Sequence, residues 1–304
     1  MKVFVTGVAG QLGHDVMNAL HQKGHMAVGS DLAPLYSGIQ DGTPAAILPY
    51  VPMDITDETR VMEILQKEKP DAVIHCAAWT AVDLAEDADK EALVYAVNGG
   101  GTRNIAAACK VLGCKMVYLS TDYVFDGEGE TPWTPDQQNY APLNVYGKSK
   151  LAGEQAVTEL LEKYFIVRIA WVFGRNGSNF VKTMLRLSEK YDSLRVVCDQ
   201  IGTPTYTKDL AQLLVEMIET EKYGRYHATN EGGFISWYDF ACEIFRQAGR
   251  QVQVTPVTTR EYGLSKAKRP HNSRLDKTKL VQNGFTPLPV WQDALARYLK
   301  EMGE

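Results

Sequence analysis

A phenol and an ammonium stand one helical turn apart in the middle of the chain, at Tyr146 and Lys150. Residues four positions apart share one face of a helix. A tyrosine with its ordinary pKa near ~10 is a poor acid or base at neutral pH, but a neighbouring ammonium stabilises the phenolate and lowers that pKa. The pair therefore predicts proton transfer by Tyr146. The alternative is a chance spacing on a solvated helix face.

Polar residues that could meet this pair follow an apolar run at residues 116–119. The run ends in Ser120-Thr121-Asp122, and ligands of parallel sheets collect at the carboxyl ends of the strands. We therefore expect Thr121 to hydrogen-bond a substrate oxygen beside the phenol. An earlier apolar run ends near Ala77 and Ala78, whose small side chains leave room for a cofactor, and Thr80 follows.

A glycine-rich turn near the amino terminus, Gly7-x-x-Gly10-x-x-Gly13, could seat a pyrophosphate. Gly7 permits a tight turn, Gly10 lets the backbone approach a phosphate, and Gly13 lets a helix pack closely on the strand. The free N–H groups at the start of that helix attract an anion. The spacing departs by one residue from G-x-G-x-x-G, so an ordinary glycine turn remains the alternative.

Asp31 closes the next apolar run, where an acid of a dinucleotide-binding fold bonds a ribose hydroxyl. A carboxylate at this point repels a 2′-phosphate and so favours NADH over NADPH. The turn and the acid together predict a nicotinamide dinucleotide as cofactor, NADH or NADPH.

Strands and helices that must position these residues alternate along the first half of the chain. Apolar runs predict strands and a 3.6-residue period predicts helices. The predicted strands are Lys2–Val5, Met26–Ser30, Asp71–His75, Met116–Ser120 and Phe165–Val172. The predicted helices are Gln11–Gln22, Thr56–Glu68, Ala92–Leu112 (interrupted by Gly99-Gly100-Gly101) and Lys148–Lys163. This alternation predicts an α/β fold with a doubly wound, Rossmann-like parallel sheet.

The second half is less regular. Its predicted helices are Asn179–Lys190, Lys208–Thr220, Ser236–Gly249 and Trp291–Met302, and its predicted strands are Leu194–Cys198 and Gln251–Val257. We expect residues 1–170 to form the dinucleotide-binding domain, to which later segments return. Residues 171–304 are expected to form mainly a smaller α/β lid that binds the substrate. No Gly/Ser or Pro linker separates the halves, so this boundary is soft.

Composition limits the class of protein. The 304 residues are 45% hydrophobic, enough for a sizeable core. The net charge of -5 gives no electrostatic reason to expect nucleic acid as a partner. No apolar run is long enough for a membrane span, and the first apolar stretch is too short for a signal peptide. The five cysteines form no Cys-x-x-Cys pair, which fits a reduced, cytoplasmic protein without a zinc site.

Several longer segments carry a resemblance to a known family. They are Ala77–Asp83, Ser120–Gly127, Pro142–Lys148, Arg168–Phe173, Asp199–Thr205 and Asn272–Leu275. Together with the glycine turn, Thr121 and Tyr146-x-x-x-Lys150, they make nearly the whole chain similar to the extended short-chain dehydrogenase/reductases. The narrower resemblance is to the dTDP-4-dehydrorhamnose reductase family. The regulatory subunit of methionine adenosyltransferase shares part of these segments.

The resemblance implies a reaction and roles for particular residues. The family reduces the 4-keto group of a dTDP-linked 6-deoxy-hexulose to give dTDP-L-rhamnose, with NADH or NADPH. By resemblance, Tyr146 donates the proton, Lys150 lowers the pKa of Tyr146 and binds the nicotinamide ribose, and Thr121 binds the C4 oxygen with Asp122 beside it. Trp171 would contact the sugar, and Arg274 could reach a nucleotide phosphate. The implied cofactor contacts are Gln11, Leu12, Asp31, Asp54, Ile55, Ala78, Trp79 and Thr80.

Other interpretations stay open at this point. An epimerase or a reductase of another nucleotide-sugar would share these motifs, and an epimerase would turn over without added NADH. A non-catalytic regulatory subunit would have no need of the Thr121, Tyr146 and Lys150 set. Some relatives use magnesium at a contact between subunits, which leaves Mg²⁺ and a homodimer open, although no ligand cluster stands out here.

Structural roles are the simplest expectation for several further residues. His75 is expected in the core, and Asp83, Glu86 and Asp87 on a solvated helix face. Asp54 could cap the helix predicted to begin near Thr56.

Overall fold

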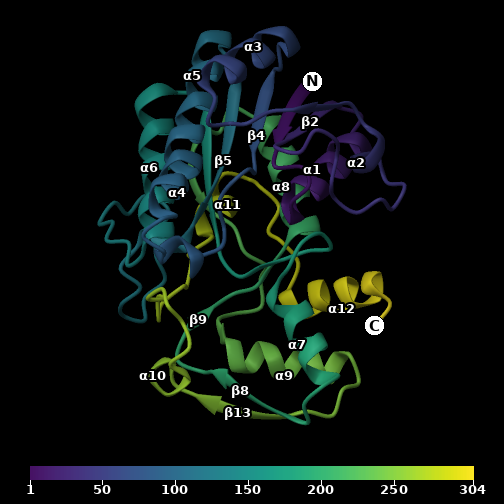
Figure 1. The fold of residues 1–304 in the computed structure, drawn as a ribbon, viewed down its shortest axis with the longest axis vertical. Helices are drawn as coiled ribbons and strands as arrows, with labels where there is room; N and C mark the ends of the chain where they lie inside the picture. The colour runs from purple at the N-terminus through teal and green to yellow at the C-terminus, as the bar shows by residue number, and fades with distance from the viewer.

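The computed structural model describes residues 1–304 and shows two parts stacked along the long axis (Figure 1). The upper part in that view is a seven-stranded parallel sheet with the order β11-β6-β5-β4-β1-β2-β3. Its strands are β1 (Lys2–Thr6), β2 (Met26–Asp31), β3 (Tyr50–Pro52), β4 (Ala72–His75), β5 (Lys115–Thr121), β6 (Tyr164–Ile169) and β11 (Gly224–His227). The doubly wound α/β fold that the sequence predicts is confirmed.

Helices cover both faces of this sheet. Side chains of a strand alternate between the faces, so Val3 and Val5 pack in one core and Phe4 in the other. The first core includes residues of α1 (Gln11–Gln22) and α8 (Thr207–Ile218). The second includes residues of α3 (Glu58–Glu68), α5 (Thr102–Leu112) and α6 (Val145–Leu160). The short helix α2 (Pro44–Ile47) follows the loop after β2. None of the helices combines the length and apolar character that a membrane crossing requires.

The long helix predicted over residues 92–112 is continuous but changes its winding. Helix α4 (Glu91–Tyr95) passes into the π-helical segment η2 (Ala96–Gly101) and then into α5. A Cβ at Gly101 would lie 2.6 Å from Ile55 Cδ1, so only glycine permits this approach. The glycines therefore widen the helix rather than break it, and π-helical turns often accompany functional sites.

Several element boundaries differ from the prediction for local reasons. Helix α6 begins at Val145 rather than Lys148 because the Asn144 side chain accepts the Gly147 N–H at 2.8 Å. Helix α3 is capped by Asp57, not Asp54, through the Arg60 N–H at 2.9 Å. Strand β6 ends before Trp171, which adopts a positive φ of 51°.

The lower part of the molecule, here called the C-terminal cluster, has its own core. It contains α7 (Phe180–Ser188), α9 (Trp237–Gln247), α10 (Thr259–Tyr262), α12 (Trp291–Met302) and the parallel pair β8 (Ser193–Val197) and β13 (Gln253–Val257). Its core includes Phe173, Tyr206, Phe240, Trp291 and Tyr298. Short pairs join β7 (Val172–Phe173) to β10 (Thr205–Tyr206) and β9 (Ile201–Gly202) to β12 (Ile235–Ser236). Ser236 caps α9.

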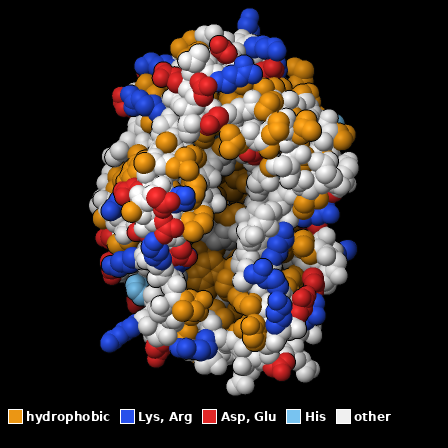
Figure 2. All heavy atoms as spheres, in the orientation of Figure 1, with side chains coloured by type: hydrophobic (Ala, Val, Ile, Leu, Met, Phe, Trp, Pro, Cys, Tyr) orange, Lys and Arg blue, Asp and Glu red, His pale blue; other side chains and the backbone are white.

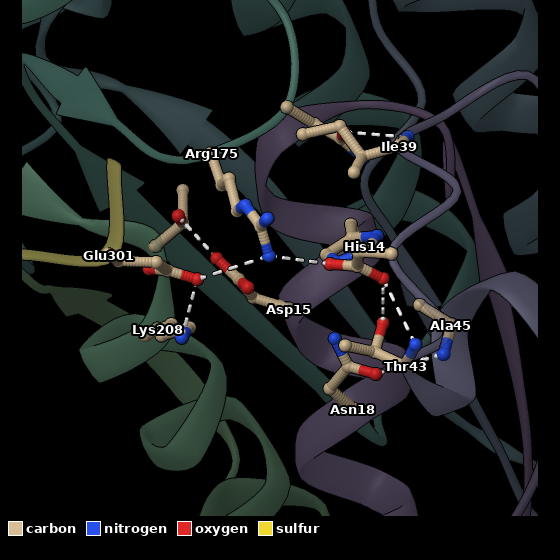
Figure 3. Close-up of polar contacts among 12 residues, drawn as sticks. His14, Asp15, Asn18, Ile39, Thr43, Ala45, Arg175, Lys208 and Glu301 are labelled. Atoms are coloured by element: carbon tan, nitrogen blue, oxygen red, sulfur yellow. Dashed lines mark hydrogen bonds and ion pairs between the residues drawn. The ribbon is translucent and has the colours of Figure 1, made fainter. Parts of the chain in front are cut away.

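A polar network joins the two parts of the molecule (Figure 3). Arg175, which follows β7, donates to Asp41 of the loop after β2 at 2.8 Å. Lys208 at the start of α8 pairs with Glu301 of α12 at 2.7 Å. The buried Asp15 of α1 accepts the Thr207 hydroxyl proton at 2.6 Å, and burial raises the pKa of Asp15 to about 7.

Candidate active site

A cavity of about 900 Å³ lies between the two parts, at the carboxyl ends of the sheet strands. Figure 2 shows it as a hollow with hydrophobic side chains along its walls. Most of the residues that the sequence singled out line it: Gly7, Gly10, Gln11, Leu12, Gly13, Asp31, Asp54, Ile55, Ala77, Ala78, Thr80, Thr121, Asp122, Tyr146, Lys150 and Trp171. The fold therefore brings segments that are far apart in sequence to one site.

The glycine turn forms the wall of the cavity between β1 and α1. Gly7 has a positive φ of 70°, and a Cβ there would lie 2.6 Å from the Ala77 nitrogen. A Cβ at Gly13 would lie 2.2 Å from the Gly7 carbonyl oxygen. Helix α1 has no side-chain cap and no acid in its first turn. Its N–H groups are thus free for an anion, which is what a pyrophosphate site requires.

Asp31 stands at the end of β2 with its carboxylate fixed by the backbone. Its two oxygens accept the Ala9 N–H at 3.0 Å and the Leu32 N–H at 2.8 Å. Lys150 and Arg269 are the only Lys or Arg side chains that line the cavity, and neither pairs with Asp31. A 2′-phosphate at this point would meet a carboxylate without a compensating cation.

Two residues expected to touch a ligand do not line the cavity: Trp79 and Arg274. The Trp79 backbone N–H binds Asn98 Oδ1 at 2.8 Å, and its indole donates to the Ala81 carbonyl at 3.1 Å. The Arg274 guanidinium donates a hydrogen bond to Asn272 Oδ1 at 3.1 Å. Their predicted contacts with ligands remain predictions.

Asn98 is a supporting residue that sequence reasoning missed. It lies in the π-helical segment, and its buried amide holds both backbone groups of Trp79 and the Ser149 hydroxyl of α6. It therefore ties the loop after β4 to the helix that carries Tyr146. Only its position beside three glycines could have marked it in the sequence.

Tyr146 lies in the first turn of α6 and faces the cavity, with the Tyr123 ring edge-on at 5.6 Å. Burial raises the pKa of Tyr146 above its ordinary value, the Asp122 carboxylate adds to the rise, and the Thr121 hydroxyl opposes it. This net direction is opposite to the lowering by Lys150 that the sequence predicts, because desolvation dominates. The phenol therefore keeps its proton at neutral pH.

Lys150 lies one turn further along α6, and its side chain is almost completely buried. Its ammonium sits 4.3 Å from the centroid of the Tyr118 ring and makes no hydrogen bond to the protein. Tyr118 donates its hydroxyl proton to the Lys150 carbonyl at 3.0 Å. Burial lowers the pKa of Lys150 to about 7, and Glu154 opposes this shift. The ammonium thus has free donors where it meets the cavity.

Unpaired polar atoms gather at the end of β5. Thr121 donates its hydroxyl proton to Asp122 Oδ1 at 3.0 Å and accepts the Tyr123 N–H at 3.2 Å. Asp122 Oδ2 and the Ser120 hydroxyl are buried without partners, and burial raises the pKa of Asp122 to about 6. Buried polar groups are normally hydrogen-bonded, so these atoms suit the hydroxyls of a ligand.

Trp171 forms the opposite wall in a strained backbone conformation. A positive φ is rare for a bulky residue and persists only where the surroundings impose it. Here Trp171 stacks on Trp237 with ring centroids 3.7 Å apart, and a Cβ at Gly202 would lie 2.9 Å from its ring. Trp171 lines the cavity, and its expected contact with the sugar remains a prediction.

A second cavity of about 330 Å³ adjoins the first, since Phe180, Trp237 and Arg269 line both. Arg195 of β8 also lines it, donates only to the Glu261 carbonyl at 3.0 Å and has no ion pair. Arg269 pairs with Asp83 at 2.8 Å. Arg195 makes the second cavity suitable for an anion, whereas the Arg269 guanidinium there is paired with Asp83, which lines the same cavity; no sequence motif had marked either arginine.

The acids after β4, expected on a solvated face, are partly exposed and also bind other segments of the chain. Asp83 accepts from Arg269 and from the Ala267 N–H at 3.0 Å, and Glu86 accepts the Val145 N–H at 2.7 Å. Asp87 pairs with Lys266.

His75 is in the core, as expected. Its ring lies between the hydroxyls of Thr6 and Thr102, and burial lowers its pKa to about 3. Nowhere in the structure do three or more His, Cys, Asp or Glu side chains stand together as metal ligands. Magnesium therefore has no identified site on this chain.

Comparisons with known proteins agree on one family. The family model described as the RmlD substrate binding domain matches residues 1–304. The chain is 42% identical over 275 residues to a dTDP-4-dehydrorhamnose reductase of Streptomyces griseus, covering 88% of each chain. A solved dTDP-4-dehydrorhamnose reductase of Clostridium acetobutylicum is 41% identical with a TM-score of 0.89, covering 100% of both chains. Another, of Bacillus anthracis in complex with NADP, is 40% identical with a TM-score of 0.86, covering 99% of both.

Proposed function

Because this chain belongs to the RmlD substrate-binding-domain family, we propose that it reduces the 4-keto group of dTDP-4-dehydrorhamnose to give dTDP-L-rhamnose. It is an NAD(P)-dependent oxidoreductase of the short-chain dehydrogenase/reductase type. The observation that carries the proposal is the meeting of Thr121, Tyr146 and Lys150 with the glycine turn in one cavity.

The cavity fits a nicotinamide dinucleotide. Gly7 and Gly13 let the turn and the start of α1 pack tightly where a Cβ would collide with the backbone, and the uncapped start of α1 suits the pyrophosphate. When bound, the cofactor supplies a hydride. Asp31 would accept a hydrogen bond from the 2′-hydroxyl of the adenosine ribose, and the lack of a cation beside it favours NADH over NADPH. Asp54, Ile55, Ala77, Ala78 and Thr80 would line the rest of the cofactor.

Tyr146 would be the proton donor. Its phenol keeps its proton in the free protein and can give it to the C4 oxygen as that oxygen gains negative charge. Thr121 would orient the same oxygen, and the unpaired Asp122 Oδ2 would accept from a sugar hydroxyl. Lys150 would hold the nicotinamide ribose and stabilise the phenolate left after proton transfer.

The nucleotide half of the substrate would extend into the second cavity. A dTDP-sugar carries a diphosphate, which Arg195 and Arg269 can bind through their planar guanidiniums. Trp171 would then face the sugar, at the junction with the first cavity. On this basis residues 171–304 supply mainly the substrate side, while α8 and β11 from the same stretch complete the sheet part.

Location and assembly belong to the same proposal. All five cysteines are free thiols, which suits a reducing compartment, so we place the reaction in the cytoplasm. A homodimer stays a prediction.

The test is an assay of purified protein with dTDP- and UDP-linked 4-keto-sugars while the loss of NADH or NADPH is followed. We expect stoichiometric oxidation of the cofactor with the dTDP-linked 4-keto-6-deoxy sugar. Turnover without added reduced cofactor would instead indicate an epimerase. Cofactor binding without turnover on any sugar would indicate a regulatory subunit.

A further inference from the structure

Three buried charged side chains lie in a row that extends from Tyr146 and Lys150 into the interior. Lys150 is 4% exposed, Glu154 one turn further along α6 is 2% exposed, and Arg168 of β6 is fully buried. Arg168 donates to both Glu154 oxygens, from Nε and from Nη2, each at 2.7 Å. Removing a charge from water costs free energy unless another group compensates for it, so each of these three charges needs an explanation.

The Lys150 ammonium has one source of negative charge nearby. On β4, burial lowers the pKa of His75 to about 3 and raises the pKa of the Cys76 thiol to about 12, so both are neutral at physiological pH. On β5 and α6, burial raises the pKa values of Tyr118 and Tyr146, which are neutral too. The Asp122 carboxylate influences Tyr146 rather than Lys150. Glu154 is therefore the carboxylate that opposes the desolvation of Lys150.

Arg168, and not Lys150, makes the ion pair with Glu154. Its two-pronged hydrogen bond occupies both carboxylate oxygens, and the guanidinium is itself fixed by the Pro135 carbonyl at 3.1 Å and the Tyr140 hydroxyl at 2.8 Å. Held as it is, Glu154 acts on Lys150 through space and leaves the ammonium donors free.

We propose that Glu154 is a positioning residue for the reduction, which keeps the Lys150 ammonium charged and aimed into the cavity, and that Arg168 holds it in that role. The inference rests on the proposed cofactor site and is independent of which sugar is reduced. Its readout is therefore cofactor binding, which remains measurable if the proposed substrate proves wrong.

The experiment measures the Kd of NADH from pH 6 to pH 8.5 for wild type and Glu154→Gln. Binding uses the charged ammonium, so it weakens as pH rises through the pKa of Lys150. Without the carboxylate this pKa falls further, and the weakening moves to lower pH. We expect a shift of about one pH unit, which is about tenfold weaker binding near pH 8 and much less change near pH 6. The kcat profile with a reducible sugar should shift in the same direction.

Three further variants separate this role from a purely structural one. Glu154→Gln/Arg168→Met leaves no unpaired buried arginine, so it carries the test if the single variant does not fold. Glu154→Asp retains the charge and the ion pair, and it should restore most of the wild-type profile. The matched control is Glu159→Gln, on the exposed face of the same helix, where the carboxylate pairs with Arg103. It should leave the profile unchanged.

The decisive comparison is the position of the pH profile, because a packing defect lowers affinity equally at all pH values. A folded variant without the Glu154 carboxylate whose profile coincides with that of wild type overturns the proposal. An equal shift in Glu154→Asp and Glu154→Gln also overturns it, since charge would then be irrelevant.

Discussion

The two ends of the cavity are formed by different kinds of residue. The end proposed for the cofactor consists of backbone and small side chains at the ends of β1, β2 and β4, and a Cβ at Gly7 or Gly13 would collide there. The end proposed for the sugar nucleotide consists of large side chains from distant segments, among them Trp171, Trp237 and Arg269.

The difference teaches which parts of a binding site are constrained by the fold. A parallel sheet presents the ends of its strands and the starts of its helices at one edge. A dinucleotide can bind at that edge where glycines let its phosphates approach the backbone closely. The C-terminal cluster imposes no comparable rule, because its contributions to the cavity come from side chains rather than from strand ends. We therefore expect changes at the two ends to separate cofactor affinity from substrate affinity.

The largest effect is expected where the two ends meet, at Tyr146. Tyr146→Phe removes the phenol proton proposed for the reacting oxygen and keeps the ring, so turnover should fall by roughly 10²–10⁴-fold. The Kd of NADH, measured by fluorescence, should stay close to the wild-type value. Retention of wild-type turnover would exclude Tyr146 as the proton donor.

A smaller effect is expected at the substrate end. Arg269→Gln removes a charged donor to the proposed diphosphate, and such hydrogen bonds contribute ~1.5–3 kcal/mol, so KM for the sugar nucleotide should rise about 10- to 100-fold. The Kd of NADH should not change. The matched control is Lys266→Gln, which removes an exposed cation of the same segment that pairs with Asp87. Equal effects of the two variants would mean that Arg269 acts only on the fold of this segment.

At the cofactor end, Asp31 is expected to set the preference between NADH and NADPH. Asp31→Asn keeps the shape but removes the negative charge, so affinity for NADPH should rise by about tenfold relative to NADH. Asp31→Ala should in addition weaken NADH, because the ribose loses an acceptor. If both variants keep the wild-type ratio of the two affinities, Asp31 does not reach the ribose.

The same contrast explains what the sequence could predict. The glycine turn, Asp31 and Tyr146-x-x-x-Lys150 are local patterns whose geometry follows from one strand, one turn or one helix, and they line the cavity as expected. Arg195 and Arg269 carry no local pattern, because only the packing of β8 and the segment after α10 on the sheet part makes them neighbours.

The sequence also could not show which ionisable side chains are buried. The spacing of Tyr146 and Lys150 predicts that the ammonium lowers the pKa of the phenol. Desolvation instead moves the two pKa values in opposite directions, Tyr146 upward and Lys150 downward. Similarly, Asp83 and Glu86 look solvated in the sequence because the segments that they bind lie far along the chain.

The smallest effect concerns stability, at the polar network that joins the two parts of the molecule (Figure 3). Burial raises the pKa of Asp15 to about 7, so the folded state binds a proton that the unfolded state releases at much lower pH. The contribution of Asp15 to stability is therefore full at low pH and falls as pH rises toward 7. Asp15→Asn cannot ionise and can still accept the Thr207 proton. Its stability relative to wild type should be greater at pH 8 than at pH 5, by roughly 2 kcal/mol or several degrees in Tm.

Asp41 serves as a control, because its replacement is expected to have the opposite effect on stability. Burial opposes its ionisation, but hydrogen bonds from Thr43 and the nearby His14 and Arg175 lower its pKa overall. Asp41→Asn should therefore lose stability at both pH values, because the charge that it removes is favourable in the folded state. Melting curves of the two variants at pH 5 and pH 8 measure both effects. A gain for Asp15→Asn that is equal at the two pH values would show that the ionisation of Asp15 is not its cause, and that the junction is sensitive to packing instead.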